Sequence, residues 1–214
     1  MDHITALPIR AGRPTREQAV LRRAQLLDVA LDHFLEKGFE NSTIESIANA
    51  VNMTKRTVYA LYDDKVALFR AAVLRAIENL AVTEKEMQST LCDTMQETLV
   101  KIAHLRVDRV MTPMGLKLQR IINTESYRFP DIFIQSYQLG ALPVIKFLSK
   151  YLKNNVKKEN LALPDPSLAA NVFISMVVSG PVRIIVSGNY LDSQEMERRI
   201  AFSVNLFLNG IKNR

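Results

Sequence analysis

Several residue types are scarce in this chain of 214 residues, and each scarcity excludes a class of protein. The single cysteine, Cys92, has no partner for an internal disulfide, so the sequence is not that of a disulfide scaffold. Seven glycines and eight prolines are too few for low-complexity or turn-rich β structure. Residues 1–5 are polar and lack the apolar core of a signal peptide, so we expect a protein of the reducing cytoplasm.

Hydrophobic residues make up 48% of the chain, which excludes a disordered protein and indicates an ordinary globular core. The formal net charge is +6, a weak hint of an anionic partner. Residues 1–16 carry a net charge of +2, residues 17–70 of −1 and residues 71–214 of +5. No segment is an undiluted basic tail, so a nucleic-acid partner has to be argued from local geometry.

The first 16 residues differ from the rest because they lack periodicity and contain Pro8, Gly12 and Pro14. They are predicted to form a flexible arm. From Glu17 the pattern becomes helical, and Gly38 is the predicted stop, since glycine occupies a left-handed position at a helix end most easily. The apolar stripe of this helix has spacings of three and four and consists of Val20, Ala24, Leu27, Leu31 and Phe34.

Residues 44–62 have the spacing of a helix-turn-helix, in which two short helices cross at a steep angle. Ala48 supplies the small residue needed at the crossing, and Val58 seals the crossing ten residues later. Asn52 stands where the tight turn requires a residue that tolerates the left-handed backbone. The first of these helices is predicted to start at Ser42 or Thr43, and Ser42 with Glu45 three residues later has the pattern of a capping box.

The second helix of this pair, predicted over 55–62 with Thr54 as its N-cap, has the composition of a helix that enters the major groove. It contains no acidic residue before Asp63, and its lysine, arginine, threonine and tyrosine side chains suit bases and phosphates. The neighbouring helix N-termini would bind phosphate. The predicted DNA-binding residues are Thr43, Thr54, Lys55, Arg56, Thr57, Tyr59, Tyr62 and Lys65. Tyr62 is equally compatible with the core.

These residues resemble a known family. The segments Leu26–Leu31, Phe34, Gly38–Phe39, Ser42–Ile44, Ile47–Ala48, Thr57–Tyr59, Tyr62, Lys65 and Leu68 look like the DNA-binding domain of the TetR family of bacterial regulators. The resemblance implies phosphate contacts from Tyr59 and Lys65, and base contacts from Lys55, Arg56 and Thr57. The family usually has Gly where Asn52 stands and Phe where Tyr62 stands. The stretch from Arg120 to Tyr137 is similar to the C-terminal domain of the AefR-like branch.

The resemblance and the helical patterns together predict an all-α protein of about nine helices. Residues 1–16 would be the flexible arm, 17–70 the three-helix DNA-binding head, and 71–214 a larger ligand-binding and dimerisation domain. Further helices are expected over about 89–110, from Pro113, over 130–154, over 166–186 and over 192–210. The arginines of the arm, Arg10, Arg13 and Arg16, either reach DNA or belong to a functionless tail.

The last two predicted helices suggest a homodimer. The segment Leu168–Leu191 is apolar enough to raise the question of a membrane span, but Asn171, the pair Gly180–Pro181 and Arg183 interrupt it, so we expect a helix buried on several sides. Paired with the last helix across a two-fold axis, it would form a four-helix interface. The predicted interface residues are Val172, Met176, Met196, Ile200, Val204, Phe207 and Ile211.

A cavity for a small, mostly apolar effector is expected in the C-terminal domain, because methionine suits adaptable pockets. Core packing is the alternative for each of these methionines. The predicted ligand-binding residues are Met87, Met95, His104, Met111, Met114, Arg120, Tyr127, Tyr137, Phe173 and Met176. Further polar candidates are Arg106, Arg109, Glu125, Gln138 and Arg183, although Arg120 and Glu125 are also compatible with an internal ion pair.

The sequence offers no pattern for catalysis or for a metal. Its three histidines are scattered, and no Ser-His-Asp order or glycine-rich phosphate loop is present. We therefore expect no enzyme, metal or cofactor. The function predicted is that of a cytoplasmic, nucleoid-associated, ligand-responsive repressor that binds a palindromic operator as a dimer. The alternatives are a ligand-independent DNA-binding protein or activator, and a small-molecule-binding protein or enzyme that retains the head.

Overall fold

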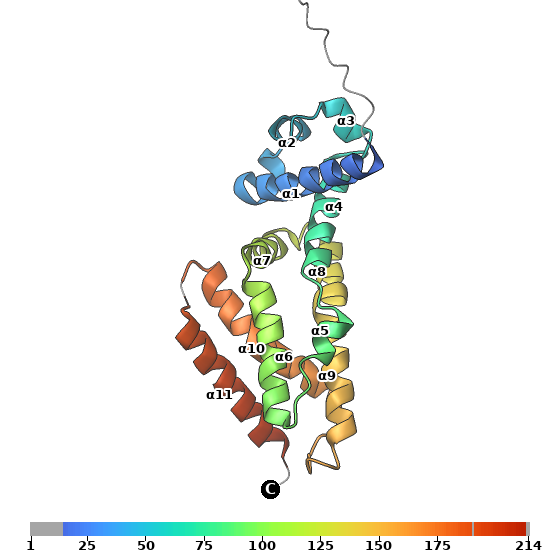
Figure 1. The fold of residues 1–214 in the computed structure, drawn as a ribbon. Helices are drawn as coiled ribbons and strands as arrows, with labels where there is room; N and C mark the ends of the chain where they lie inside the picture. The colour runs from blue at the N-terminus through green and yellow to red at the C-terminus, as the bar shows by residue number, and fades with distance from the viewer. Residues whose placement is uncertain (1–14, 190, 213–214) are drawn as a thin grey trace, which may run out of the picture. The chain divides into compact units, whose positions relative to one another are not determined.

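A computed structural model describes residues 15–189 and 191–212 of the chain (Figure 1). Arg10 and Arg13 of the predicted arm lie outside these residues. The chain divides between Phe69 and Arg70 into two compact units, and each is described here by itself. The described residues contain helices, turns and one isolated β-bridge, between Leu161 and Lys212. The predicted all-α fold is confirmed.

The first unit consists of α1 (Arg16–Asn41), α2 (Ile44–Ala50), α3 (Lys55–Tyr59) and the start of α4 (Lys65–Asn79). The N-cap of α1 is Thr15, whose side chain accepts from the backbone N–H of Gln18. Gly38 interrupts α1 with a φ of 75°, a conformation that only glycine adopts at little cost. The chain can then turn back, so that Phe34, Phe39 and Phe69 pack with ring centroids 5.0–5.7 Å apart.

The predicted turn of the helix-turn-helix is confirmed in its details. Asn52 has a φ of 51°, and Ala48 and Val58 are fully buried where α2 and α3 pack together. Of the two predicted starting residues of α2, Ser42 and Thr43, the second is confirmed, but the predicted capping box of Ser42 with Glu45 is wrong. Thr43 is the N-cap and forms a capping box with Ser46. Ser42 donates instead to the carbonyl oxygens of His33 and Gly38, at 3.0 and 2.8 Å.

The second unit contains the rest of α4 and all the later helices. The helices α7, α8, α10 and α11 begin within one residue of the predicted positions, with Thr112 as the N-cap of α7 and Asp192 as that of α11. The short α5, capped by Thr83, was not predicted, and α6 begins after Thr94 rather than near Ser89. The elements are α5 (Glu84–Gln88), α6 (Met95–Met111), α7 (Pro113–Glu125), α8 (Pro130–Ser136), η1 (Tyr137–Ala141), α9 (Leu142–Asn155), α10 (Pro166–Val186) and α11 (Ser193–Ile211).

The helix predicted from Pro130 to Asn154 is continuous but contains one unpredicted π-helical turn. The segments α8, η1 and α9 follow one another without a gap from Pro130 to Asn155, and η1 is the π-helical part, over Tyr137–Ala141. Turns of this kind, set inside α-helices, recur at functional sites.

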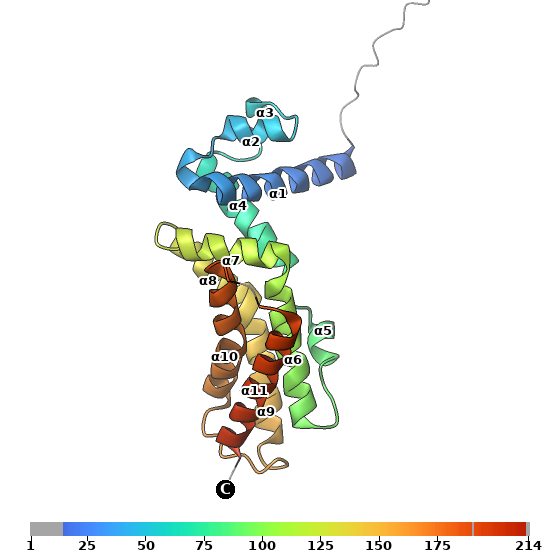
Figure 2. The ribbon, with the colours of Figure 1, turned by 90° about the vertical axis from the view of Figure 1, so that its left-hand side faces the viewer.

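The helix α10 is the centre of the second unit. It packs against α6, α7, α9 and α11, and Figure 2 shows α6, α9, α10 and α11 running side by side. Phe173 of α10 is fully buried, with its ring centroid 4.9 Å from that of Phe207 in α11. By length and hydropathy, Pro166–Val186 is the one described helix that could also cross a membrane. The core helix of a helical bundle meets the same criteria, and α10 occupies such a place here.

The apolar stripe of α11 faces the interior of its own unit, which corrects part of the predicted dimer interface. Ile200, Val204, Phe207 and Ile211 are between 1% and 8% exposed and belong to the core cluster that includes Phe173. Periodicity identifies the apolar face of a helix but not what covers it. Of the predicted interface residues, Val172 is exposed, whereas Met176 and Met196 are half-buried.

The sharp corner between α6 and α7 depends on Gly115. A Cβ at this position would collide with the carbonyl oxygen of Val110 and would lie 2.7 Å from that of Arg109. Because both obstacles are backbone atoms, no side-chain rotation relieves the collision. By contrast, a Cβ at Gly210 in α11 meets no atom within 4 Å.

We predict that Gly115→Ala lowers the free energy of unfolding by about 1–3 kcal/mol, the usual cost of overpacking. The matched variant Gly210→Ala should leave it unchanged or raise it by up to about 1 kcal/mol, since alanine is the better helix former. Urea denaturation followed by circular dichroism measures both. Equal stability of the two variants would contradict the close approach at the α6–α7 corner.

Candidate DNA-binding surface and effector cavity

The helix α3 presents a cationic and hydroxyl-bearing surface to solvent. Its N-cap, Thr54, accepts from the backbone N–H of Thr57 at 3.1 Å, and the two threonine hydroxyls lie 2.8 Å apart. Val58 anchors the opposite side of the helix in the core. Lys55, Arg56, Thr57 and Tyr59 are all exposed, and no acidic residue lies within α3. The structure therefore brings the central predicted DNA-binding residues together on one face.

Two features extend this surface. The ammonium of Lys55 lies 6.0 Å from the ring centroid of Tyr59, within reach of a cation–π contact that orients both side chains. Thr43, also exposed, accepts from the backbone N–H of Ser46 at 3.1 Å. The remaining free N–H groups of the first turn of α2 carry the partial positive charge that favours phosphate.

Tyr62 belongs to the core and not to this surface. It is 6% exposed, and its hydroxyl accepts from Nε of Arg23 in α1 at 2.9 Å. Of the two interpretations that the sequence allowed, the structure supports the core one. The sequence could not distinguish the two, because the hydrogen-bond partner of Tyr62 is Arg23, 39 residues away, and no local pattern links these residues.

Lys65 is also occupied within the first unit. Its ammonium donates to the carbonyl oxygens of Phe39, Glu40 and Ser42 at 2.9, 3.1 and 3.1 Å. It also lies 4.4 Å from the ring centroid of Phe39. A lysine ammonium has three donors, and all three are used here. The phosphate contact that the family resemblance implied for Lys65 is therefore corrected: the side chain ties the start of α4 to the end of α1.

In the second unit the predicted ligand-binding residues do not come together. Met87, Met95 and Phe173 lie in the apolar core, whereas Arg120 and Tyr127 are exposed. Tyr137 is partly exposed and accepts from the amide of Asn171 at 3.3 Å. His104 pairs with Glu197 at 3.1 Å, and Met114 is half-buried in α7. For Met87 and Met95, core packing, the alternative that the sequence allowed, is the one observed.

Two of the predicted ligand residues do line clefts. Met111 lies in a cleft of about 390 Å³ between α6, α7, the end of α10 and the start of α11, and Asp108 and Glu197 also line it. Met176 lies in a cleft of about 280 Å³ between α10 and α11. A third cleft, of about 490 Å³, lies between α7 and α10 and includes Arg183, one of the further polar candidates.

A smaller and more enclosed cavity lies where α4, α6, α7 and the α8–η1 segment meet. We call it the Arg106 cavity; its volume is about 20 Å³. Its walls are mostly apolar with a few polar groups, and they consist of Ile77, Leu80, Arg106, Arg109, Val110, Gly115, Leu118, Gln119, Ser136 and Gly140. Arg106 and Arg109 were among the polar candidates from the sequence.

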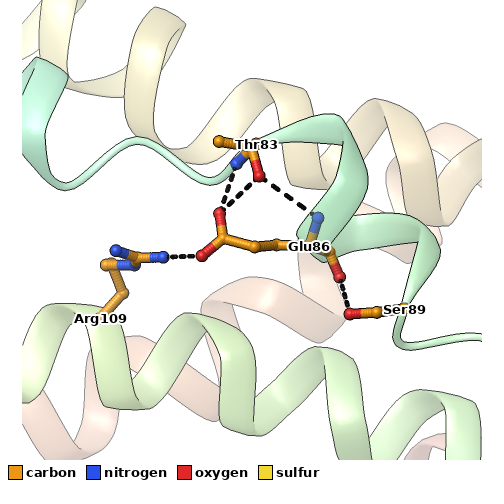
Figure 3. A network of polar contacts seen from close by, with 4 residues as sticks. All are labelled: Thr83, Glu86, Ser89 and Arg109. Carbon is orange, nitrogen blue, oxygen red and sulfur yellow. Dashed lines mark hydrogen bonds and ion pairs between the residues drawn. The ribbon is translucent and has the colours of Figure 1, made fainter.

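Arg109 has its own counter-ion. Figure 3 shows its guanidinium paired with one carboxylate oxygen of Glu86. The other oxygen of Glu86 accepts from the backbone N–H and the hydroxyl of Thr83, at 2.8 and 2.7 Å. These hydrogen bonds, followed by the positive charge of Arg109, hold the pKa of Glu86 below its usual value. The carboxylate is therefore ionised and fully engaged at neutral pH.

Arg106 is in the opposite situation. It is 8% exposed, and its Nε is buried without a hydrogen-bond partner among the described residues. Burial lowers the pKa of its guanidinium, and the positive charge of Arg109 lowers it further. Arginine nevertheless remains protonated in proteins, so a buried and uncompensated cation lines the cavity.

Comparison with known proteins agrees with this geometry. Residues 26–72 match the profile described as bacterial regulatory proteins of the tetR family. Residues 97–210, more than half of the chain, match the profile described as the C-terminal domain of an AefR-like transcriptional repressor. The chain belongs to the TetR family. Both resemblances drawn from the sequence are thereby confirmed.

Each of three relatives covers more than nine-tenths of the chain. The HTH-type transcriptional regulator YvkB of Bacillus subtilis is 22% identical over 204 residues, covering 93% of this chain and 98% of that one. A TetR-family regulator from Mesorhizobium loti has the same fold, with a TM-score of 0.76, 23% identity, and coverage of 94% and 100%. The flavonoid-responsive regulator FrrA has a TM-score of 0.68, with 27% identity and coverage of 91% and 99%. The chain is a transcriptional regulator of this family.

For this TetR-family member we predict that Lys65→Met lowers the free energy of unfolding by about 1.5–3 kcal/mol, the usual value for hydrogen bonds to a charged group. Lys55→Met, which removes an exposed lysine of α3, should change stability by less than about 0.5 kcal/mol. Thermal unfolding followed by circular dichroism measures both. If Lys65→Met kept full stability but bound DNA more weakly, the structural role of Lys65 would be contradicted and its contact with phosphate supported.

Proposed function

We propose that this regulator binds a palindromic operator as a homodimer and is released from it by a small molecule. The observation that carries the DNA-binding step is the exposed face of α3, where Lys55, Arg56, Thr57 and Tyr59 gather without an acid. Arginine reads guanine edges in the major groove, and tyrosine hydroxyls bind phosphate. In a dimer the two α3 helices would enter major grooves about one helical turn apart or more, which is why the operator would be palindromic.

The dimer is supported by apolar side chains that the second unit leaves uncovered. Leu168 and Val172 of α10 are 61% and 51% exposed, and Phe202 and Leu206 of α11 are 68% and 54% exposed. Phe202 also lines the same cleft as Met176, so the two helices share this outer surface. We assign it to a second copy of the chain, since α10 and α11 from two protomers complete a four-helix interface.

We propose that the regulator represses transcription rather than activating it. Support comes from the description of the C-terminal profile as an AefR-like repressor. IcaR of Staphylococcus epidermidis, named a negative regulator, is 35% identical over 49 residues. FasR of Mycolicibacterium smegmatis, named an activator, is 28% identical over 87 residues, so activation is the alternative. A reporter gene behind the operator distinguishes the two: deleting the regulator raises expression for a repressor and lowers it for an activator.

Release by a small molecule is supported by the cavities of the second unit and by the relative named as flavonoid-responsive. The helix α4 offers a route for the response, since its start, at Lys65, is fixed in the first unit and its end, at Ile77, lines the Arg106 cavity. A ligand acts only through a difference in affinity between the two conformations of the dimer. We propose no catalytic, metal or cofactor chemistry for this chain.

We predict that Arg56→Ala weakens binding to the operator by about 1–3 kcal/mol and also relaxes the sequence preference. Tyr59→Ala should weaken binding to all sequences by a similar factor, because a phosphate contact carries no sequence information. Lys150→Ala, which removes an exposed cation of α9, is the matched control and should bind normally. Fluorescence anisotropy with the chain's own upstream DNA and scrambled DNA measures all three. Unchanged operator affinity of Arg56→Ala would remove α3 as the reading helix.

For the dimer, we predict that Leu206→Glu gives a monomer at micromolar concentration, because it places a charge within the exposed apolar surface of α10 and α11. Leu91→Glu changes a comparably exposed leucine outside that surface and should stay dimeric. Multi-angle light scattering after size exclusion gives the mass of each. A wild-type chain that elutes as a stable monomer would contradict the proposed dimer.

A further inference from the structure

The Arg106 cavity is the one place among the described residues where a buried cation lacks a counter-ion. Nε of Arg106 has no partner, and no hydrogen bond or ion pair joins its guanidinium to another described residue. A buried charge without a partner is strongly unfavourable, and buried charges in folded proteins are as a rule paired with an opposite charge. The unpaired guanidinium therefore points to an anion that is not part of the chain.

The acidic residue that pairs with Arg109 cannot supply that anion. Glu86 pairs with Arg109 through one oxygen and with Thr83 through the other, as Figure 3 shows. Arg109 adds a positive charge beside Arg106, so the local electrostatic potential favours an anion further. Arg106 and Arg109 are thus chemically alike but differ in that only Arg109 is neutralised from within the protein.

The other residues that line the cavity indicate the chemistry of the rest of the ligand. Ile77, Leu80, Val110 and Leu118 are apolar, and Gln119 and Ser136 offer hydrogen-bonding groups. Apolar walls gain nothing from a small hydrated ion, whereas they stabilise a hydrocarbon body. An arginine guanidinium matches a carboxylate with two parallel hydrogen bonds. The lining is thus suited to an amphiphilic acid, with its charge at Arg106.

We propose that the effector is an organic acid whose carboxylate pairs with Arg106 and whose apolar body lies in the Arg106 cavity. This assignment rests on the proposed function, since it names the class of the releasing ligand, and it adds an acidic group to the small, mostly apolar effector expected from the sequence.

The cavity is so small that binding of the organic acid requires a conformational change of the protein. At about 20 Å³ it holds roughly one water molecule, so a hydrocarbon body enters only if the lining helices separate. The π-helical turn η1 is next to Ser136 and contains Gly140, so this wall has a segment that can change register by one residue. Ile77 places α4 in the same wall, and α4 continues back to Lys65.

The test uses the purified 214-residue chain and matched pairs of probes: octanoate, benzoate and cinnamate, each beside its primary amide, with inorganic phosphate as an anion without a hydrocarbon body. Isothermal titration calorimetry without DNA gives each Kd. We expect at least one acid to bind about tenfold or more tightly than its amide and than phosphate. Arg106→Met should abolish that preference, while Arg120→Met, which removes an exposed cation of α7, should retain it. Arg106→Gln gives the same readout if Arg106→Met fails to fold.

A second measurement does not depend on the choice of acid. Without ligand, Arg106→Met or Arg106→Gln should melt about 2 °C or more above the wild type, because each removes an uncompensated buried charge. A lower melting temperature of both variants would show that Arg106 has a stabilising partner within the protein. That result, or acids that bind no better than their amides, overturns the proposal.

Failure of this proposal and failure of the proposed function are distinguishable by adding operator DNA. If an acid binds through Arg106 but leaves operator affinity unchanged, the cavity assignment stands and release by this ligand fails. If instead a neutral compound releases the operator while no acid binds through Arg106, the ligand-responsive regulator stands and the acid assignment is wrong.

Discussion

The whole function depends on holding a helix of five residues in place. An isolated helix as short as α3 is not stable in water, so its geometry has to come from its surroundings. Val58 packs it against α2 at Ala48, Asn52 turns the chain between the two helices, and Thr54 caps the first turn. With one side fixed in this way, every other side chain of α3 is exposed to solvent, as the proposed contact with DNA requires.

Because α3 depends on its surroundings, two of the side chains predicted to contact DNA have structural roles instead. Lys65 satisfies three carbonyl oxygens at the end of α1, and Tyr62 seals the core with Arg23 on its hydroxyl. Each side chain stabilises the frame that α3 stands on, and neither has a donor or face left for DNA. The second unit shows the opposite case, since the surrounding helices leave Nε of Arg106 without a hydrogen-bond partner. We assign this site to an anion.

Local signals in the sequence were sufficient for the helix-turn-helix and for most helix boundaries. Asn52, Thr54 and Pro113 act through the residues next to them, so their roles are readable without the fold. The roles that depend on distant partners were not readable: Lys65 acts on carbonyls 23 to 26 residues away. The stripe of α11 was identified correctly as apolar but assigned to the wrong neighbour, since hydrophobic periodicity does not distinguish a core from an interface. The unpaired state of Arg106 is likewise a property of the three-dimensional structure alone.

The central claim is that α3 reads a two-fold symmetric site, one copy for each half. Selection of bound sequences from a random DNA pool by the purified chain, at moderate salt, tests it most directly. The account predicts enrichment of an inverted repeat whose half-sites lie about one helical turn apart or more. No enrichment over the starting pool, or a motif without two-fold symmetry, would contradict it.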